Sequence, residues 1–164
     1  MSSQNQAEKP NYFNTIATGL GYLNPPRTVE PKQGKPYQVV RLSVLQGSVD
    51  DPVYANFELK VVGQALDAIA VLKDALNDEN TPVLVGFTAS DVYAQGFTFS
   101  SGKRKGEIGS VVKGRLIKIK WAKVNGAHVE LPGQDEADRE GGPPTPAPAA
   151  GPMRQQHRQA ARRR

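Results

Sequence analysis

The chain has 164 residues, no cysteine, two histidines and a formal net charge of +5 at pH 7. This length allows one domain and a tail. The absence of cysteine excludes a disulfide framework and a thiolate zinc site, and two histidines cannot build a zinc site alone, so we expect no metal and no cofactor. No apolar run reaches the ~20 residues of a membrane-spanning helix, and no signal-peptide pattern is present. These features predict a cytoplasmic protein.

The first half of the chain alternates between strand and turn patterns. Residues 1–11 are polar, and we expect them to be disordered. Alternation of apolar and polar residues predicts three strands, over 12–23, 37–45 and 54–62. Gly19 and Gly21 share one face of the first strand, where the missing Cβ would allow a close backbone approach. Apolar residues at helical spacing then predict a single helix over 65–76.

A long hairpin follows the helix. We predict an outbound strand over 83–99, a glycine-rich turn over 100–106 and a return strand over 111–124. Residues 101–123 hold eight basic side chains and one acidic side chain, whereas residues 1–100 hold seven basic and ten acidic side chains. This concentration of positive charge on the hairpin suggests a polyanion as the partner. The alternative is a solvated lysine-rich edge that prevents strand-to-strand aggregation.

The element order predicts the fold class. Three strands, a helix and two strands follow one another in the OB-fold, a five-stranded Greek-key barrel that binds oligonucleotides. A parallel βαβ sheet would need several helices, and only one is evident. We therefore expect a mainly β protein with an OB-fold domain over 12–126 and one helix between strands 3 and 4. Residues 127–164 have acidic, Pro-Gly-Ala-rich and arginine-rich parts, and we expect a disordered tail.

Cations and aromatic rings, most of them on this hairpin, are the candidate DNA-binding residues, because single strands are bound by phosphate contacts and base stacking. The predicted phosphate contacts are Lys103, Arg104, Lys105, Lys113, Arg115, Lys118 and Lys120. The predicted stacking residues are Tyr54, Tyr93, Phe97, Phe99 and Trp121. Tyr22 and Arg27 are added because OB-fold loops meet the ligand near the end of the first strand.

Each of these candidates has an alternative role. A lysine on a strand is often only a solvated charge, and an aromatic ring in a small barrel is often part of the core. Trp121 shares a face with Ile117 and Ile119 by strict alternation, which leaves core and stacking roles open. No catalytic constellation is evident, because neither the dinucleotide fingerprint nor the phosphate-binding loop has its required spacing. We therefore expect a binding protein and not an enzyme.

Several stretches resemble the single-stranded-DNA-binding-like replication proteins of integrative and conjugative elements. The shared stretches are residues 19–24, 83–87, 97–99, 102–106, 119–121 and 123–124. The likeness covers residues 12–126, and the architecture is similar to that of bacterial single-stranded-DNA-binding proteins. The resemblance implies binding of single-stranded DNA with little sequence preference during replication or transfer of a mobile element.

The resemblance also implies a homodimer or homotetramer that works with other replication or transfer proteins. This chain ends in arginines, however, where the bacterial proteins end in an acidic tip that recruits partners. Two other functions stay open at this point. One is an OB-fold module that binds a protein of the replication or transfer machinery, and the other is an RNA-binding OB domain.

Overall fold

A computed structural model describes residues 13–134 of the chain. The expectations for residues 1–11 and for most of the C-terminal tail lie outside this range. The described elements, in chain order, are β1 (Ile16–Leu23), β2 (Arg27–Val29), β3 (Tyr37–Gly47), β4 (Pro52–Val61), α1 (Gln64–Asn77), β5 (Val83–Thr98), β6 (Ile108–Val124) and β7 (Ala127–Val129). The mainly β composition and the helix between the third and fourth long strands are confirmed.

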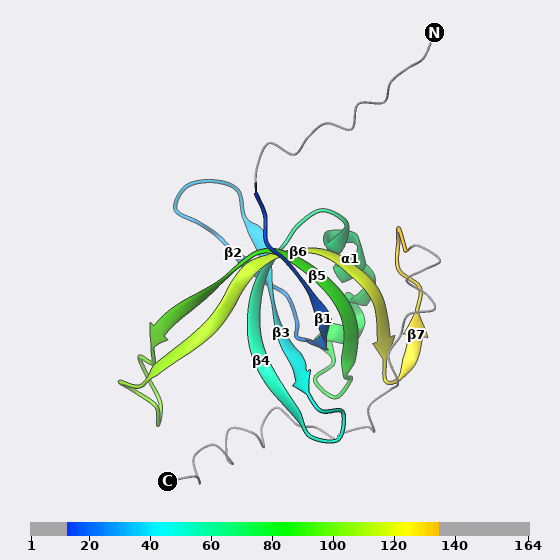
Figure 1. The fold of residues 1–164 in the computed structure, drawn as a ribbon. Helices are drawn as coiled ribbons and strands as arrows, with labels where there is room; N and C mark the ends of the chain where they lie inside the picture. Colours follow the sequence, from blue (N-terminus) through cyan, green and yellow to red (C-terminus); the bar gives the residue numbers. More distant parts are fainter. Residues whose placement is uncertain (1–12, 135–164) are drawn as a thin grey trace.

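The strands form one closed sheet (Figure 1). Its order is β1-β5-β6-β4-β3-β2, and β1 also pairs with β3, which closes the ring. The neighbouring strands run antiparallel except for β4 and β6, which run parallel. Gly21 and Tyr22 of β1 pair on both sides, and Gly21 lies opposite Val44 of β3 and Val85 of β5. A closed sheet leaves few exposed edges, which protects a small β protein from aggregation.

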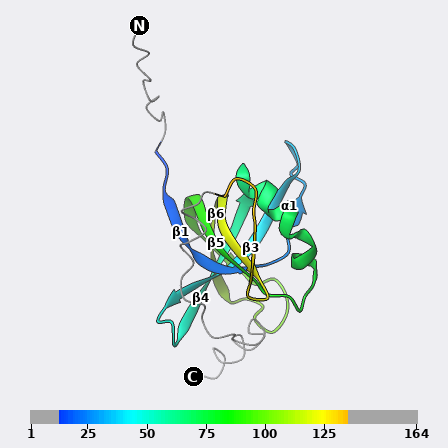
Figure 2. The same ribbon diagram turned by 90° about the vertical axis from the view of Figure 1, so that its right-hand side faces the viewer.

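The core lies inside this barrel and under α1. Alternating side chains of the strands point inward, and Leu59, Val85 and Leu116 have no exposed surface. The helix packs its apolar face against the barrel through Ala65, Ala68, Ile69, Leu72 and Leu76. Figure 2 shows α1 on one side of the barrel. The helix begins after Gly63, whose φ of 57° ends β4 and favours glycine.

Two register shifts in β6 correct the expectation for Trp121. Ile117 and Lys120 are extra residues in the pairing with β5, so strict alternation does not hold along this strand. Ile119 is fully buried in the core, whereas Trp121 pairs with Gly86 and covers it. Gly86 lies between the inward-facing Val85 and Phe87, so the indole lies on the outer side of the sheet. With 5% of its surface exposed, Trp121 is not a stacking platform.

The ordered fold continues past the predicted boundary at residue 126. β7 pairs with β6 through residues 127–129, and Leu131 is buried in the core. The Gln64 side chain donates a hydrogen bond of 2.9 Å to the Pro132 carbonyl, which ties this segment to the start of α1. The expectation of disorder from residue 127 is therefore wrong for 127–134. The composition of this segment does not indicate that Leu131 is buried in the core.

The outer part of the β5–β6 hairpin forms a two-stranded arm that extends away from the barrel (Figure 1). The arm comprises residues 93–113, and its strands pair from Tyr93 opposite Lys113 to Thr98 opposite Ile108. Near its tip, the Phe97 and Phe99 rings meet edge to face with centroids 4.9 Å apart. A Cβ on Gly109 would lie only 2.6 Å from Phe97, so this glycine lets both rings lie against the opposite strand.

Candidate nucleic-acid interface

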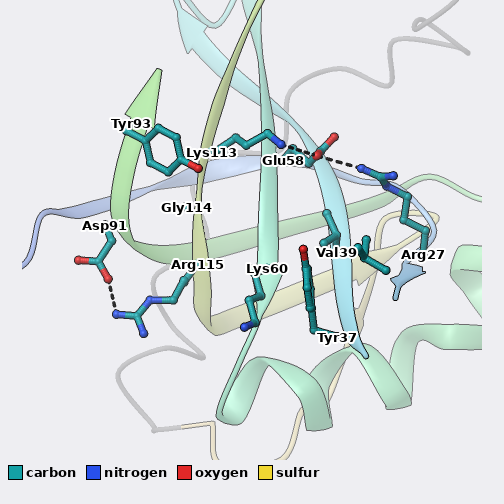
Figure 3. A pocket seen from close by; sticks show the side chains of 11 residues that line it. Arg27, Tyr37, Val39, Glu58, Lys60, Asp91, Tyr93, Lys113, Gly114 and Arg115 are labelled. Atoms are coloured by element: carbon teal, nitrogen blue, oxygen red, sulfur yellow. Dashed lines mark hydrogen bonds and ion pairs between the residues drawn. The ribbon is translucent and has the colours of Figure 1, made fainter. Parts of the chain in front are cut away.

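An open groove of about 490 Å³ lies on the outer face of the barrel, between the root of the arm and β2 (Figure 3). The lining residues are Arg27, Val29, Tyr37, Val39, Glu58, Lys60, Asp91, Tyr93, Lys113, Gly114 and Arg115. Four of these side chains are cationic and two are carboxylates, so the lining has an excess of positive charge. A groove with cations and rings along it suits a strand of phosphates and bases.

Strand alternation and register place these residues together. In β4, Leu59 points into the core, so Glu58 and Lys60 on either side of it point outward into the groove. The parallel pairing of β4 with β6 sets Glu58 beside Lys113 and Lys60 beside Arg115. Cross-strand neighbours of this kind are close enough to interact directly.

Glu58 is the electrostatic centre of the groove. Its Oε1 atom lies 2.9 Å from Arg27 Nη2 and 3.2 Å from Lys113 Nζ, and its Oε2 atom accepts a hydrogen bond of 3.4 Å from Arg41 Nε. Burial by itself would raise the pKa of Glu58, but the hydrogen bond from Lys113 and the charges around the carboxylate outweigh it and lower that pKa. Glu58 is therefore ionised at neutral pH.

The root of the arm forms one wall of the groove. Tyr93 is 57% exposed and pairs with Lys113 across the hairpin. Asp91 and Val92 interrupt the pairing just before Tyr93, and Asp91 adopts a φ of 53°. The carboxylate of Asp91 forms an ion pair with Arg115. This bulge and ion pair lie where the arm leaves the barrel, and a bulge bends the strand that carries it.

The opposite wall comes from β2 and β3. The Tyr37 ring lies there with Lys60 Nζ 4.7 Å from its centroid, which is a cation–π contact. Val39 is a buried apolar part of this wall. Figure 3 shows Glu58 and Lys60 between the Tyr93 wall and the Arg27 wall. The groove thus has an aromatic ring on each side and charged groups along its floor.

Four of the sequence-predicted site residues line this groove: Arg27, Tyr93, Lys113 and Arg115. The three cations of the turn, Lys103 to Lys105, are exposed at the tip of the arm. Arg104 is engaged there, because its Nε lies 2.8 Å from Glu107 Oε2 and its guanidinium lies 4.4 Å from the Phe99 ring centroid. Phe97 and Phe99 are also on the arm, beyond the groove.

The other predicted site residues lie elsewhere. Lys118 and Lys120 are half-buried on the barrel part of β6 and do not line the groove. Tyr22 and Tyr54 form a ring pair with centroids 6.5 Å apart, also outside the groove. Burial, with a smaller effect from Tyr54, raises the pKa of Tyr22. Trp121 is buried against Gly86, as described above.

Sequence reasoning missed several lining residues: Tyr37, Val39, Glu58, Lys60 and Asp91. The outward faces of β3 and β4 were visible in the alternation, because their partners Val40 and Leu59 are strongly apolar. The predicted site concentrated on the hairpin with the most positive charge, and of these two strands only Tyr54 was given a role in binding. Combining the outward faces of neighbouring strands would have found Tyr37 and Lys60.

The chemistry that this groove offers is recognition of an anion, with rings available for stacking. Within residues 13–134, no group of three or more His, Asp or Glu side chains is arranged to hold a metal ion. In the same range, no helix has both the length and the apolar character needed to cross a membrane.

Comparison with known proteins gives one family. A family model described as "Protein of unknown function (DUF3577)" matches residues 6–137. Neither the curated proteins nor the solved structures contain a match to the chain.

Proposed function

The chain belongs to the DUF3577 family of proteins of unknown function, and from its geometry we propose that it binds single-stranded DNA, without catalysis and with little sequence preference. The groove beside the arm is the proposed binding site. One observation carries the proposal: cations and two tyrosines from five strands line a single groove on the outside of a closed β barrel. Phosphates would contact the cations, and bases would stack on Tyr37 and Tyr93.

We further propose that the barrel is an OB-fold. Leaving out the short β2 and β7, the ring runs β1-β3-β4-β6-β5 and back to β1, with the helix between the third and fourth long strands. In OB-folds, oligonucleotides bind across strands 2 and 3 and between the loops that join strands 1 to 2 and 4 to 5. The groove lies on the outer face of β3 and β4, between the β1–β3 connection and the β5–β6 hairpin. The position of the groove therefore supports both parts of the proposal.

The resemblance to replication proteins of integrative and conjugative elements supports a setting in replication or transfer of mobile DNA. In that setting, exposed single strands arise in many sequences, and a binding protein gains from contacts that every nucleotide offers. Phosphates and base faces are such contacts, whereas base edges are not.

The test is titration of the full chain with a labelled dT oligomer, followed by fluorescence anisotropy at several salt concentrations. We expect Lys60→Ala to weaken binding and to reduce the slope of log K against log salt by about 0.7, the contribution of one phosphate contact on a single strand. We expect Tyr93→Ala to weaken binding by the ~1–3 kcal/mol of one stacked base.

Lys73→Ala is the matched control for Lys60→Ala, because Lys73 is exposed on α1 and does not line the groove. It removes the same charge and should leave binding unchanged. Competition with rU oligomers and with duplex DNA separates DNA binding from RNA binding and single strands from double strands. Absence of binding to the dT oligomer at low salt would refute the proposed function.

A further inference from the structure

We propose that Glu58 limits the affinity of the groove by acting as an internal anion, which holds the cations that a backbone phosphate would otherwise contact. This inference rests on the proposed function, since it concerns the same groove. It identifies a residue that controls how tightly the groove holds an anionic strand. A carboxylate and a phosphodiester both present acceptor oxygens to Arg and Lys, so they compete for the same donors.

Glu58 forms ion pairs with several cations at once. Its two oxygens contact cations from three different strands, Arg27 of β2, Arg41 of β3 and Lys113 of β6. Only 13% of the Glu58 side chain is exposed, whereas the side chains of the three cations are 33% to 69% exposed. The carboxylate therefore lies beneath the cations and draws them toward the groove floor. A phosphate above them meets charges that are already partly neutralised.

The second carboxylate of the groove has a different arrangement. Asp91 is 39% exposed and forms an ion pair with Arg115 at the root of the arm. Glu58 is more deeply placed and contacts three cations, so its charge is less screened by solvent and acts on more phosphate donors. Glu58 is the carboxylate whose removal should change binding most.

Removal of the Glu58 carboxylate should raise the affinity for a phosphate strand, because the two anions compete for the same cations. A phosphate that contacts Lys113 or Arg27 must displace Glu58 or share the cation with it, and the uncompensated carboxylate repels the incoming phosphate. When Glu58 is replaced by neutral glutamine, the three cations keep their positions on the strands but lose the internal competitor. Affinity for a polyanion should then rise, and more of the binding should depend on salt.

The experiment compares the full chain with its Glu58→Gln variant in dT-oligomer titrations at several salt concentrations. We expect the dissociation constant to fall about tenfold, equivalent to about 1.4 kcal/mol, and the salt slope to become steeper. Asp74→Asn is the matched control, because Asp74 is exposed on α1 and the substitution makes the same charge change away from the groove. It should leave both quantities unchanged.

A double-mutant cycle with Lys113→Ala tests the mechanism. Loss of Lys113 should weaken binding more in the Glu58→Gln background than in the wild type, because only there is the lysine fully available to phosphate. Glu58→Asp provides a second variant that keeps the charge and withdraws the carboxylate from Lys113 and Arg27. Its affinity should lie between those of the wild type and Glu58→Gln, with circular dichroism confirming the fold of each variant.

The outcomes separate this inference from the proposed function. If the wild type binds the dT oligomer and Glu58→Gln binds with equal or lower affinity, the role of Glu58 is overturned and the proposed function stands. Equal effects of Lys113→Ala in both backgrounds would overturn it in the same way. If neither the wild type nor Glu58→Gln binds, the proposed function itself fails, and this inference fails with it.

Discussion

At the scale of single residues, the contact between Trp121 and Gly86 shows how one missing Cβ fixes a large side chain. A Cβ at position 86 would lie 2.4 Å from the indole Nε1 atom, far inside the distance that real atoms allow. We therefore expect Gly86→Ala to displace the indole and to lower the free energy of unfolding by about 1–3 kcal/mol, the usual cost of overpacking. Urea denaturation measures this change.

Gly96→Ala is the control for that substitution, because Gly96 lies in the same strand and its added Cβ would have only the Gly109 carbonyl oxygen near it, at 3.9 Å. Both substitutions reduce the backbone freedom of the unfolded chain in the same way. The difference between them therefore isolates the clash with the indole. Equal stabilities of the two variants would show that Trp121 does not depend on Gly86.

At the scale of elements, β1 closes the barrel at Gly21. A Cβ there would lie 2.5 Å from the Ser43 carbonyl oxygen and 2.9 Å from the Val44 Cα, and neither backbone atom can move without breaking the β1–β3 pairing. We expect Gly21→Ala to destabilise the fold by more than about 2 kcal/mol. Thermal denaturation and hydrogen exchange of β1 measure the effect.

Gly19→Ala is the comparison for Gly21→Ala, since both glycines face inward on the same strand. At Gly19 the added Cβ would meet the Phe87 ring at 3.4 Å, which is an ordinary contact. This variant should retain nearly all of the wild-type stability. Loss of stability at position 19 as large as that at position 21 would mean that any added methyl group inside the barrel, and not closure of the ring, explains both results.

Elements differ in how far the sequence predicts them. The helix and the five long strands were predictable, because their apolar periods are strong and their ends are marked by Gly, Pro and Asn. The side-chain directions along β6 were not, since Ile117 and Lys120 shift the register without any sequence signal. Trp121 was therefore placed on the wrong face. The contact between Arg27 and Glu58 could not be predicted either, because it depends on which strands become neighbours when the ring closes.

At the scale of the whole molecule, the barrel and the groove depend on segments that are far apart in the chain. The groove takes residues from β2 to β6, and the core is completed by Leu131 after the last strand. Residues 127–134 therefore belong to the folding unit although they contribute nothing to the groove lining. Truncation before residue 127 should therefore lower the stability of the fold without removing any residue that lines the groove.

Two truncations test this division. A chain that ends at Gln134 keeps β7, Leu131 and the hydrogen bond from Gln64 to Pro132, so it should unfold like the full chain. A chain that ends at Gly126 loses all three, and we expect it to be less stable by about 2–5 kcal/mol, the range for removal of a buried leucine. Denaturant unfolding of both proteins, with Leu131→Ala in the full chain as reference, gives the comparison. Equal stability of the two truncated chains would place the end of the folding unit at β6, whereas a large loss confined to the shorter chain would place it at Leu131.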